Sequence, residues 1–189
     1  MMYNSKQGSD FLKIFICSDI HGSAYYCKKM IEAFSHSGAR RLVILGDILY
    51  HGPRNDLPLE YNPKAVIEML NPLSDKILAV RGNCDTEVDQ MVLSFPVLAD
   101  YGFLCLGDKT AYLTHGHHID EIPFCDNDLV ISGHTHVPKA EKVKNYININ
   151  PGSISIPKEN SPHGFIIFEN NTFSFYDLET GNVYKTYEF

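Results

Sequence analysis

Leu42-Val43-Ile44-Leu45-Gly46-Asp47 is the stretch of sequence that decides the fold. Its four apolar residues predict a short strand that is buried on both faces. Gly46 allows the backbone to turn sharply, and Asp47 then lies at the carboxyl edge of the sheet, where open α/β folds place their sites. A single Gly-Asp after a strand is usually only a turn. The functional interpretation therefore depends on other stretches that end in the same way.

Four further apolar stretches run into residues that commonly bind metals. The strands predicted at 12–17, 76–80, 111–114 and 129–131 are followed by Asp19 and His21, by Asn83, by His115, and by His134 and His136, respectively. In extended backbone, Asp19 and His21 would point the same way because they are two residues apart. All of these side chains offer oxygen or nitrogen atoms, which argues against a structural zinc site made of cysteines.

A pair of metal ions about 3.5–4 Å apart needs a ligand that both ions share. A carboxylate has two oxygens and can bridge them, and we predict that Asp47 does so. Such a pair holds a phosphate and lowers the pKa of the water between the ions, which gives a hydroxide nucleophile near neutral pH. Any one of the histidines, taken alone, is more commonly a surface or packing residue.

The remaining elements predict the layers of the fold. A helix is expected from Ser23 to Gly38, a second from Asn62-Pro63 to Leu70, and a short one within 85–91. Closely spaced strands at 146–149, 165–168 and 172–176 imply antiparallel pairing in a second sheet. We therefore expect an α/β (α+β) fold, a two-sheet β-sandwich flanked by helices in four layers, αββα. Residues 1–189 are expected to form a single domain, with residues 1–10 frayed.

Composition narrows the classes of function. The net charge of −7 argues against a basic nucleic-acid-binding surface, although bound cations would allow an anionic substrate. Five cysteines without any Cys-x-x-Cys spacing suit free thiols in a reducing cytosol, so we expect a cytoplasmic protein. No stretch predicts a signal peptide or a membrane span. A homo-oligomer is left open.

The quoted motifs have a clear resemblance. Five of them resemble, in order and spacing, the blocks of the calcineurin-like metallophosphoesterase superfamily: Asp19-Ile20-His21-Gly22, Gly46-Asp47, Gly82-Asn83, Thr114-His115-Gly116-His117 and Gly133-His134-Thr135-His136. The chain is also similar to the small bacterial YfcE-type phosphodiesterases within that superfamily, through its short length, His51-Gly52-Pro53-Arg54-Asn55, Gly82-Asn83-Cys84-Asp85 and Asn150-Pro151-Gly152-Ser153.

The resemblance implies two divalent metal ions, often Mn²⁺, with Ni²⁺, Co²⁺, Zn²⁺ and iron as alternatives. It assigns one ion to Asp19, His21, Asp47 and His136, and the other to Asp47, Asn83, His115 and His134. It also implies that Asp47, Asn83, Cys84 and His115 take part in catalysis. Many members of the superfamily have a histidine where this chain has Cys84, and that histidine is held to protonate the leaving group. An inert small residue in a turn is the alternative for Cys84.

Substrate contacts are predicted for four residues outside the ligand set. Arg54 and Asn55 are suited to donate hydrogen bonds to a substrate phosphate, with an ordinary solvated loop as the alternative. His51 and His117 are assigned to substrate binding as well. For His117, the alternative is contact with a metal ligand rather than with the substrate.

The function expected from these features is a dinuclear metal-dependent phosphodiesterase acting on a small substrate. A phosphomonoesterase is the alternative within the same class. A third possibility is a protein-binding scaffold like the retromer subunit of this fold, whose pocket has lost ligands. All seven ligand positions of this chain carry competent donors, which favours an enzyme.

Overall fold

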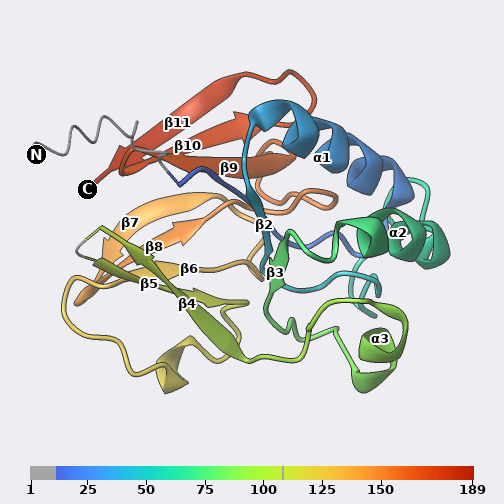
Figure 1. Ribbon diagram of the computed structural model, residues 1–189, viewed down its shortest axis with the longest axis horizontal. Helices are drawn as coiled ribbons and strands as arrows, with labels where there is room; N and C mark the ends of the chain where they lie inside the picture. The colour runs from blue at the N-terminus through green and yellow to red at the C-terminus, as the bar shows by residue number, and fades with distance from the viewer. Residues whose placement is uncertain (1–11, 108) are drawn as a thin grey trace, which may run out of the picture.

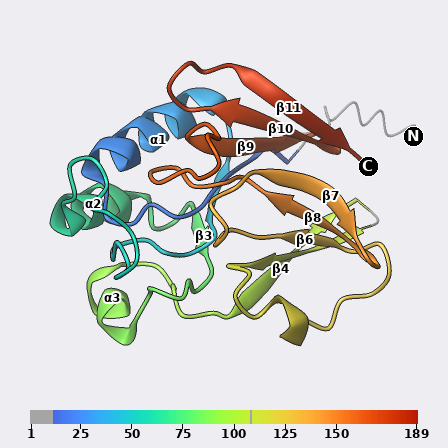
Figure 2. The ribbon, with the colours of Figure 1, turned by 180° about the vertical axis from the view of Figure 1, so that it is seen from behind.

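The computed structural model describes residues 12–107 and 109–189, and the predicted fraying of residues 1–10 lies outside them. Two β-sheets pack against each other, and helices cover the outer face of one sheet (Figure 1). The same layers are seen from behind in Figure 2. The predicted two-sheet sandwich with flanking helices is thus confirmed.

The first sheet has six strands. Across the sheet they are β11 (Val183–Glu188), β10 (Thr172–Asp177), β9 (Gly164–Glu169), β1 (Ile14–Cys17), β2 (Arg41–Ile44) and β3 (Ile77–Ala79). The strands β1, β2 and β3 are parallel, whereas β9 pairs antiparallel with β1 and β10. The predicted strand at 42–45 is β2, so Asp47 follows the middle strand of the parallel part.

The second sheet has five strands. Their order is β4 (Tyr101–Leu106), β5 (Lys109–Thr114), β6 (Leu129–Ile131), β8 (Tyr146–Asn150) and β7 (Lys139–Val143). The strands β5, β6 and β8 are parallel to one another, and the edge strands β4 and β7 are antiparallel to their neighbours. Each sheet therefore contains three neighbouring parallel strands, at one side of the first sheet and in the centre of the second.

Three α-helices and two 3₁₀ turns lie among the described residues. They are α1 (Ala24–Ser37), α2 (Pro63–Leu70), η1 (Asn71–Leu73), α3 (Glu87–Val92) and η2 (Ile119–Glu121). The Ser23 hydroxyl caps α1 by accepting from the Tyr26 N–H, and Gly38 ends that helix in the left-handed conformation. Asn62 caps α2, as predicted. None of these helices has the length and apolar character needed to cross a membrane.

The strand β1 is apolar throughout because both of its faces are covered. Phe15 and Cys17 pack toward the helices, in one cluster with Phe34 of α1. Ile14 and Ile16 point the other way, into the layer between the sheets. A strand buried on both faces must be a continuous apolar run, which is the pattern that the sequence carries.

The structure corrects the predicted assignment of the last third of the chain. We expected the strands of this region to form the second sheet by antiparallel pairing. Instead, β9 and β10 join the first sheet, and β8 joins the second sheet in parallel with β6. The second sheet also contains β5 and β6, so the strands that precede His115, His134 and His136 lie in a different sheet from β2. Local strand patterns do not reveal which sheet a strand enters, because both sheets present similar apolar faces.

Three strands were not predicted, and all three are edge strands. Only one residue of these three strands, β4, β7 and β11, is buried, and β4 contains Gly102. Edge strands are covered on fewer sides and carry a weaker apolar signal. The segment that contains η2 contacts the second sheet, since the Tyr112 hydroxyl donates to the Pro123 carbonyl at 3.2 Å, but Phe103 of β4 is 65% exposed. A full helical layer is not formed there by the described residues.

Phe15 gives a direct test of the layer between α1 and the first sheet. Its ring is fully buried, stacks on Phe165 at 4.4 Å and meets Phe34 edge-on at 5.9 Å. Phe15→Ala should lower the free energy of unfolding by about 3–5 kcal/mol, because it leaves a cavity in a packed core. Urea denaturation measures this change. The control Phe103→Ala removes a ring that is 65% exposed and should cost less than about 1 kcal/mol; equal losses would contradict the described core.

Candidate metal centre

The predicted ligands come together where the parallel strands of both sheets end. Asp19 and His21 follow β1, Asp47 follows β2, Asn83 follows β3, His115 follows β5, and His134 and His136 follow β6. Backbone hydrogen bonds join these ends, since the Asp19 N–H donates to the Gly46 carbonyl at 3.1 Å. Between the sheets, the His134 N–H donates to Oδ2 of Asp19 at 3.1 Å. The site is thus a seam to which both sheets contribute.

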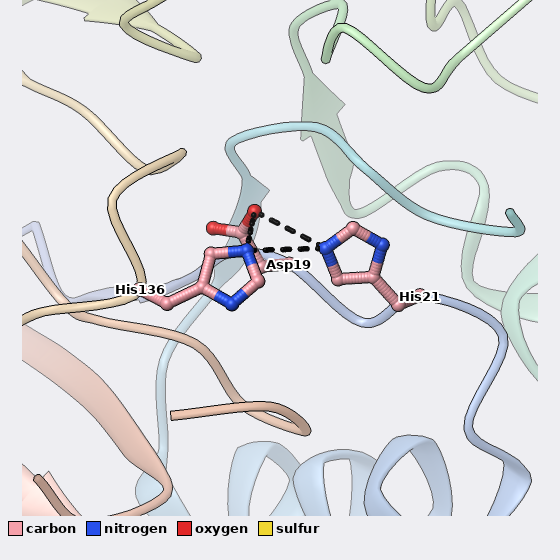
Figure 3. A group of neighbouring side chains, drawn as sticks. All are labelled: Asp19, His21 and His136. Carbon is pink, nitrogen blue, oxygen red and sulfur yellow. Dashed lines mark hydrogen bonds and ion pairs between the residues drawn. The ribbon is translucent and has the colours of Figure 1, made fainter. Parts of the chain in front are cut away.

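Asp19, His21 and His136 form the first group of converging side chains (Figure 3). Oδ1 of Asp19 lies 3.2 Å from Nε2 of His136 and 3.6 Å from Nε2 of His21. The two Nε2 atoms are 3.3 Å apart. All three residues are buried.

Asp47, Asn83, His115 and His134 form the second group. Nε2 of His115 lies 3.1 Å from Oδ1 of Asn83 and 3.4 Å from Oδ2 of Asp47. Nδ1 of His134 lies 3.2 Å from the same Nε2 atom. The carboxylate of Asp47 also reaches the first group, because its Oδ2 lies 3.6 Å from Nε2 of His21. Asp47 therefore stands between the groups, where a bridging ligand would have to be.

Backbone carbonyls orient three of the histidines. Nδ1 of His21, His115 and His136 lies 2.8, 2.7 and 2.6 Å from the carbonyl oxygens of Tyr50, Leu45 and Ile156, respectively. A carbonyl can only accept, so each Nδ1 carries the proton and donates it. The lone pair of each neutral ring is then on Nε2, which faces the carboxylates. This arrangement is typical of metal-binding histidines.

The backbone at the site is left-handed at several ligand positions. The φ angles of Asp19, His21, Asp47, His134 and His136 lie between 49° and 68°. The prediction that Asp19 and His21 lie on extended backbone is therefore wrong, because the chain curls at each strand end to aim the side chain inward. Left-handed backbone is uncommon outside glycine, and it clusters at functional sites.

Two of the predicted glycines are required by close packing of the loops. A Cβ on Gly82 would lie 2.1 Å from Oδ1 of Asp47, and one on Gly133 would lie 1.9 Å from the Ser18 hydroxyl. No side chain fits at these positions. The Gly-Asn and Gly-His motifs therefore allow the ligand loops of different strands to touch.

Charges at the site couple strongly. Burial by itself would raise the pKa of Asp19, but the adjacent imidazoles of His136 and His21 hold it well below its usual range. Burial would likewise lower the pKa of His115, yet the neighbouring Asp47 and Asp19 raise it to about 9. A proton thus takes the place of a cation on His115 when no metal is present, and a metal ion would have to displace it.

The residues fit divalent metal ions. Oδ1 of Asp19 is buried and accepts no hydrogen bond, although two imidazole nitrogens face it. Asp19, Asp47 and His115 also place three donor atoms within 4.8 Å of one another. Carboxylate and imidazole donors without thiolates suit Mn²⁺, Zn²⁺, Ni²⁺ and similar ions.

A cavity of about 400 Å³ opens beside the two groups. Its lining includes Asp47, Asn83, Cys84, His134 and His136 from the site, and Arg54 and Asn55 from the predicted substrate contacts. The other two predicted contacts do not line this cavity. His51 packs edge-on against Tyr61, with ring centres 5.2 Å apart, and His117 lines a neighbouring cavity that Asn83 also lines.

The thiol of Cys84 lies at the site as well. With His21 and Asp47 it forms a third set of donor atoms within 4.8 Å of one another. Burial and the charge of Asp47 raise the pKa of Cys84 to about 12, so its thiol stays protonated near neutral pH.

Asp85 was missed as a site residue by the sequence analysis. Its buried carboxylate accepts hydrogen bonds from the N–H groups of Asp47, Ile48 and Gly82 at 2.8, 2.9 and 2.8 Å. These bonds tie the loop that carries Asp47 to the loop that carries Asn83. The available signal was the motif Gly82-Asn83-Cys84-Asp85, because its acidic residue was not assigned to either predicted metal ion.

Two serines anchor the backbone of Asp19 and were also missed. The hydroxyls of Ser153 and Ser155 both donate to the backbone carbonyl of Asp19, at 2.8 and 2.9 Å. They come from the loop after β8, which begins with the motif Asn150-Pro151-Gly152-Ser153. A small hydroxyl residue in a loop has no pattern of its own that predicts this contact.

The sequence profile of the calcineurin-like phosphoesterase superfamily domain matches residues 12–172. The chain belongs to this superfamily. It is 46% identical to phosphodiesterase YfcE of Escherichia coli K12 over 166 residues, which are 86% of this chain and 90% of that protein. Membership of this phosphoesterase superfamily implies divalent metal ions, in agreement with the donors described above.

Solved structures of the superfamily fold agree with this assignment. The structure described as Yfce, a phosphoesterase from E. coli, has a TM-score of 0.88 and 43% identity, covering 93% of this chain and 98% of that chain. Vacuolar protein sorting 29 of Cryptosporidium parvum has a TM-score of 0.62 at 17% identity, covering 95% and 98% of the two chains. The latter likeness shows only that the fold is shared.

Asp85→Asn tests the tie between the ligand loops. The amide has one oxygen, so at least one of the three N–H groups loses its acceptor and stays buried. We expect the free energy of unfolding to fall by about 2–4 kcal/mol. Calorimetric or denaturant unfolding measures it. In the control Asp128→Asn, the carboxylate accepts one exposed N–H, that of Cys125, and the loss should stay below about 1 kcal/mol. A wild-type stability for Asp85→Asn would refute the anchoring role.

Proposed function

We propose that this chain is a phosphodiesterase that uses two divalent metal ions to hydrolyse a small phosphodiester. The observation that carries the proposal is the convergence of donors from both sheets, with three histidines tethered through Nδ1 so that Nε2 faces two buried carboxylates. The 46% identity to a protein named a phosphodiesterase supports the diester as substrate class. Mn²⁺ is the proposed metal.

The proposed division of ligands follows the two groups of side chains. Asp19, His21 and His136 hold one ion, and Asn83, His115 and His134 hold the other. Asp47 is the shared ligand, since its carboxylate lies within reach of histidines from both groups. Two ions bound there would neutralise the phosphate and activate a water molecule as the nucleophile.

The chain itself supplies orientation and charge around the substrate. Arg54 and Asn55 line the cavity beside the ligands, and we assign them to the substrate phosphate. Asp85 keeps Asp47 and Asn83 at fixed separation through its three hydrogen bonds. His51 and His117 stay weaker predictions, because neither lines this cavity.

Cys84 is proposed to take a minor part in expelling the leaving group. Burial and the charge of Asp47 raise the pKa of its thiol, and a thiol of high pKa is a poor proton donor. Diesters whose leaving groups depart unaided are therefore the favoured substrates. A protein-binding scaffold finds no support in the site, where every predicted ligand position carries a competent donor.

A cytoplasmic location is part of the proposal. All five cysteines are free, and Cys105 and Cys125 are exposed. Free exposed thiols are typical of a reducing compartment.

Asp47→Asn tests the bridging role. An amide carries no charge and bridges two cations poorly, so the variant should hold at most one tightly bound ion per chain. Elemental analysis after dialysis against metal-free buffer counts the ions. Asp56→Asn, in the exposed loop nearby, is the control and should keep the wild-type content. Full metal content together with normal turnover in Asp47→Asn would overturn the assignment.

Cys84 is tested with diesters of graded leaving-group pKa. On a nitrophenyl diester, Cys84→Ala should keep kcat/KM within about tenfold of wild type, which is about 1.4 kcal/mol of barrier. Cys84→His should help most with basic alkoxide leaving groups, where general-acid catalysis is worth more. A loss of about a thousandfold in Cys84→Ala, or about 4 kcal/mol, with both ions retained, would make the thiol a direct catalytic group.

A further inference from the structure

The cavity beside the metal centre has an unexpected charge distribution. The protein has a net charge of −7, yet the only carboxylate among the residues that line this cavity is Asp47, which belongs to the metal centre. Two cationic side chains line it as well, Arg54 and Lys158. The wall outside the ligands is therefore positive, on a protein that is negative overall.

Lys158 has no partner for its ammonium group within the described residues. Lys13 pairs with Glu169 and Lys139 with Glu141, whereas Lys158 is an exposed residue that forms no such pair among the described residues. The contacts of Lys158 involve its backbone alone. A cation without a counter-ion at the lining of a cavity is available to a ligand.

The backbone holds Lys158 in place relative to the site. Its N–H donates to the carbonyl of His136 at 3.1 Å, and its own carbonyl accepts from the hydroxyl of Ser161 at 2.6 Å. His136 in turn donates from Nδ1 to the carbonyl of Ile156. The segment that carries Lys158 is thus fastened to a proposed metal ligand, and it faces the cavity that Arg54 lines from a distant part of the sequence.

A simple phosphodiester carries one negative charge. Asp19 and Asp47 offset two of the four positive charges of two divalent ions, and the remaining charge together with Arg54 already exceeds the single negative charge of the diester. The charge of Lys158 is therefore not needed to balance that group. An ammonium group is a compact charge that binds a carboxylate or a phosphate well. We propose that the substrates of this site carry a second anionic group on one of the esterified alcohols, and that Lys158 binds it as a specificity-determining residue. This inference rests on the proposed phosphodiesterase function.

A matched pair of diesters tests the inference. Both have the same nitrophenolate leaving group, and the aryl group that remains on phosphorus carries either a para-carboxylate or a neutral para-carboxamide. Wild type should prefer the carboxylate by about fivefold in kcat/KM, mainly through KM, as expected for a partly exposed charge pair. A third diester with a para-phosphonomethyl group asks whether a phosphate-like anion binds better than a carboxylate.

Substitutions of Lys158 test whether this residue causes the preference for the carboxylate. Lys158→Ala should reduce the carboxylate-to-carboxamide ratio to about one, and Lys158→Arg should restore most of it. The control Lys64→Ala removes the same charge from an exposed position on α2 and should keep the wild-type ratio. A ratio near one in wild type would overturn the inference. An equal loss on both diesters in Lys158→Ala would also overturn it, because the lysine would then contact the scissile phosphate.

A binding measurement separates this inference from the proposed function. Calorimetric titration of the Mn²⁺-loaded protein with 4-carboxybenzylphosphonate and its carboxamide needs no hydrolysis, because the carbon–phosphorus bond is stable. Tighter binding of the carboxylate by about fivefold, lost in Lys158→Ala, supports the anion site even if no diester is cleaved, and absent cleavage refutes the proposed function alone. Equal binding of the two ligands, with diesters still cleaved, refutes only the role of Lys158.

Discussion

Two carboxylates buried beside each other, those of Asp19 and Asp47, are the constraint on which the structure depends. Burying one unpaired charge is costly, and burying two of the same sign is more so. The surrounding histidines offset this cost, which is why the pKa of Asp19 stays low despite its complete burial. These carboxylates and histidines meet only where five strands from two sheets end at one seam. The burial of the charges therefore depends on the topology of the fold.

The strained backbone at the seam has identifiable supports. Several ligand residues lie in the left-handed region, which costs about 1–3 kcal/mol at each non-glycine position. Asp85 compensates for part of this cost around Asp47 by accepting three N–H groups, and Ser153 and Ser155 hold the carbonyl of Asp19. Hydrogen bonds within the chain therefore hold the loops of the site in place, as preorganisation requires.

Sequence patterns reveal some parts of this protein and not others. The position of Asp47 at the end of β2 could be predicted because a continuous apolar run followed by Gly46 marks the end of a buried strand, and the same pattern placed Asn83 and His115 at strand ends. The edge strand β4 could not, because it is exposed on alternate residues and contains Gly102. Asp85 acts through hydrogen bonds to backbone N–H groups, two of them in a distant loop. Such bonds produce no periodic pattern in the sequence from which they could be predicted. The division of strands between the two sheets depends on long-range pairing, which local patterns do not encode.

The seam also links the lifetime of the protein to its surroundings. Since neither sheet alone carries a full set of donors, a cation bound there acts as a removable cross-link that exists only when both sheets are docked. Mass action then adds RT ln(1 + [M]/Kd) to the free energy of unfolding, about 2.7 kcal/mol at a hundred times Kd. In a metal-starved cell the sheets would separate more often, and proteases would reach the opened chain. Abundance, as well as turnover, would follow the supply of metal.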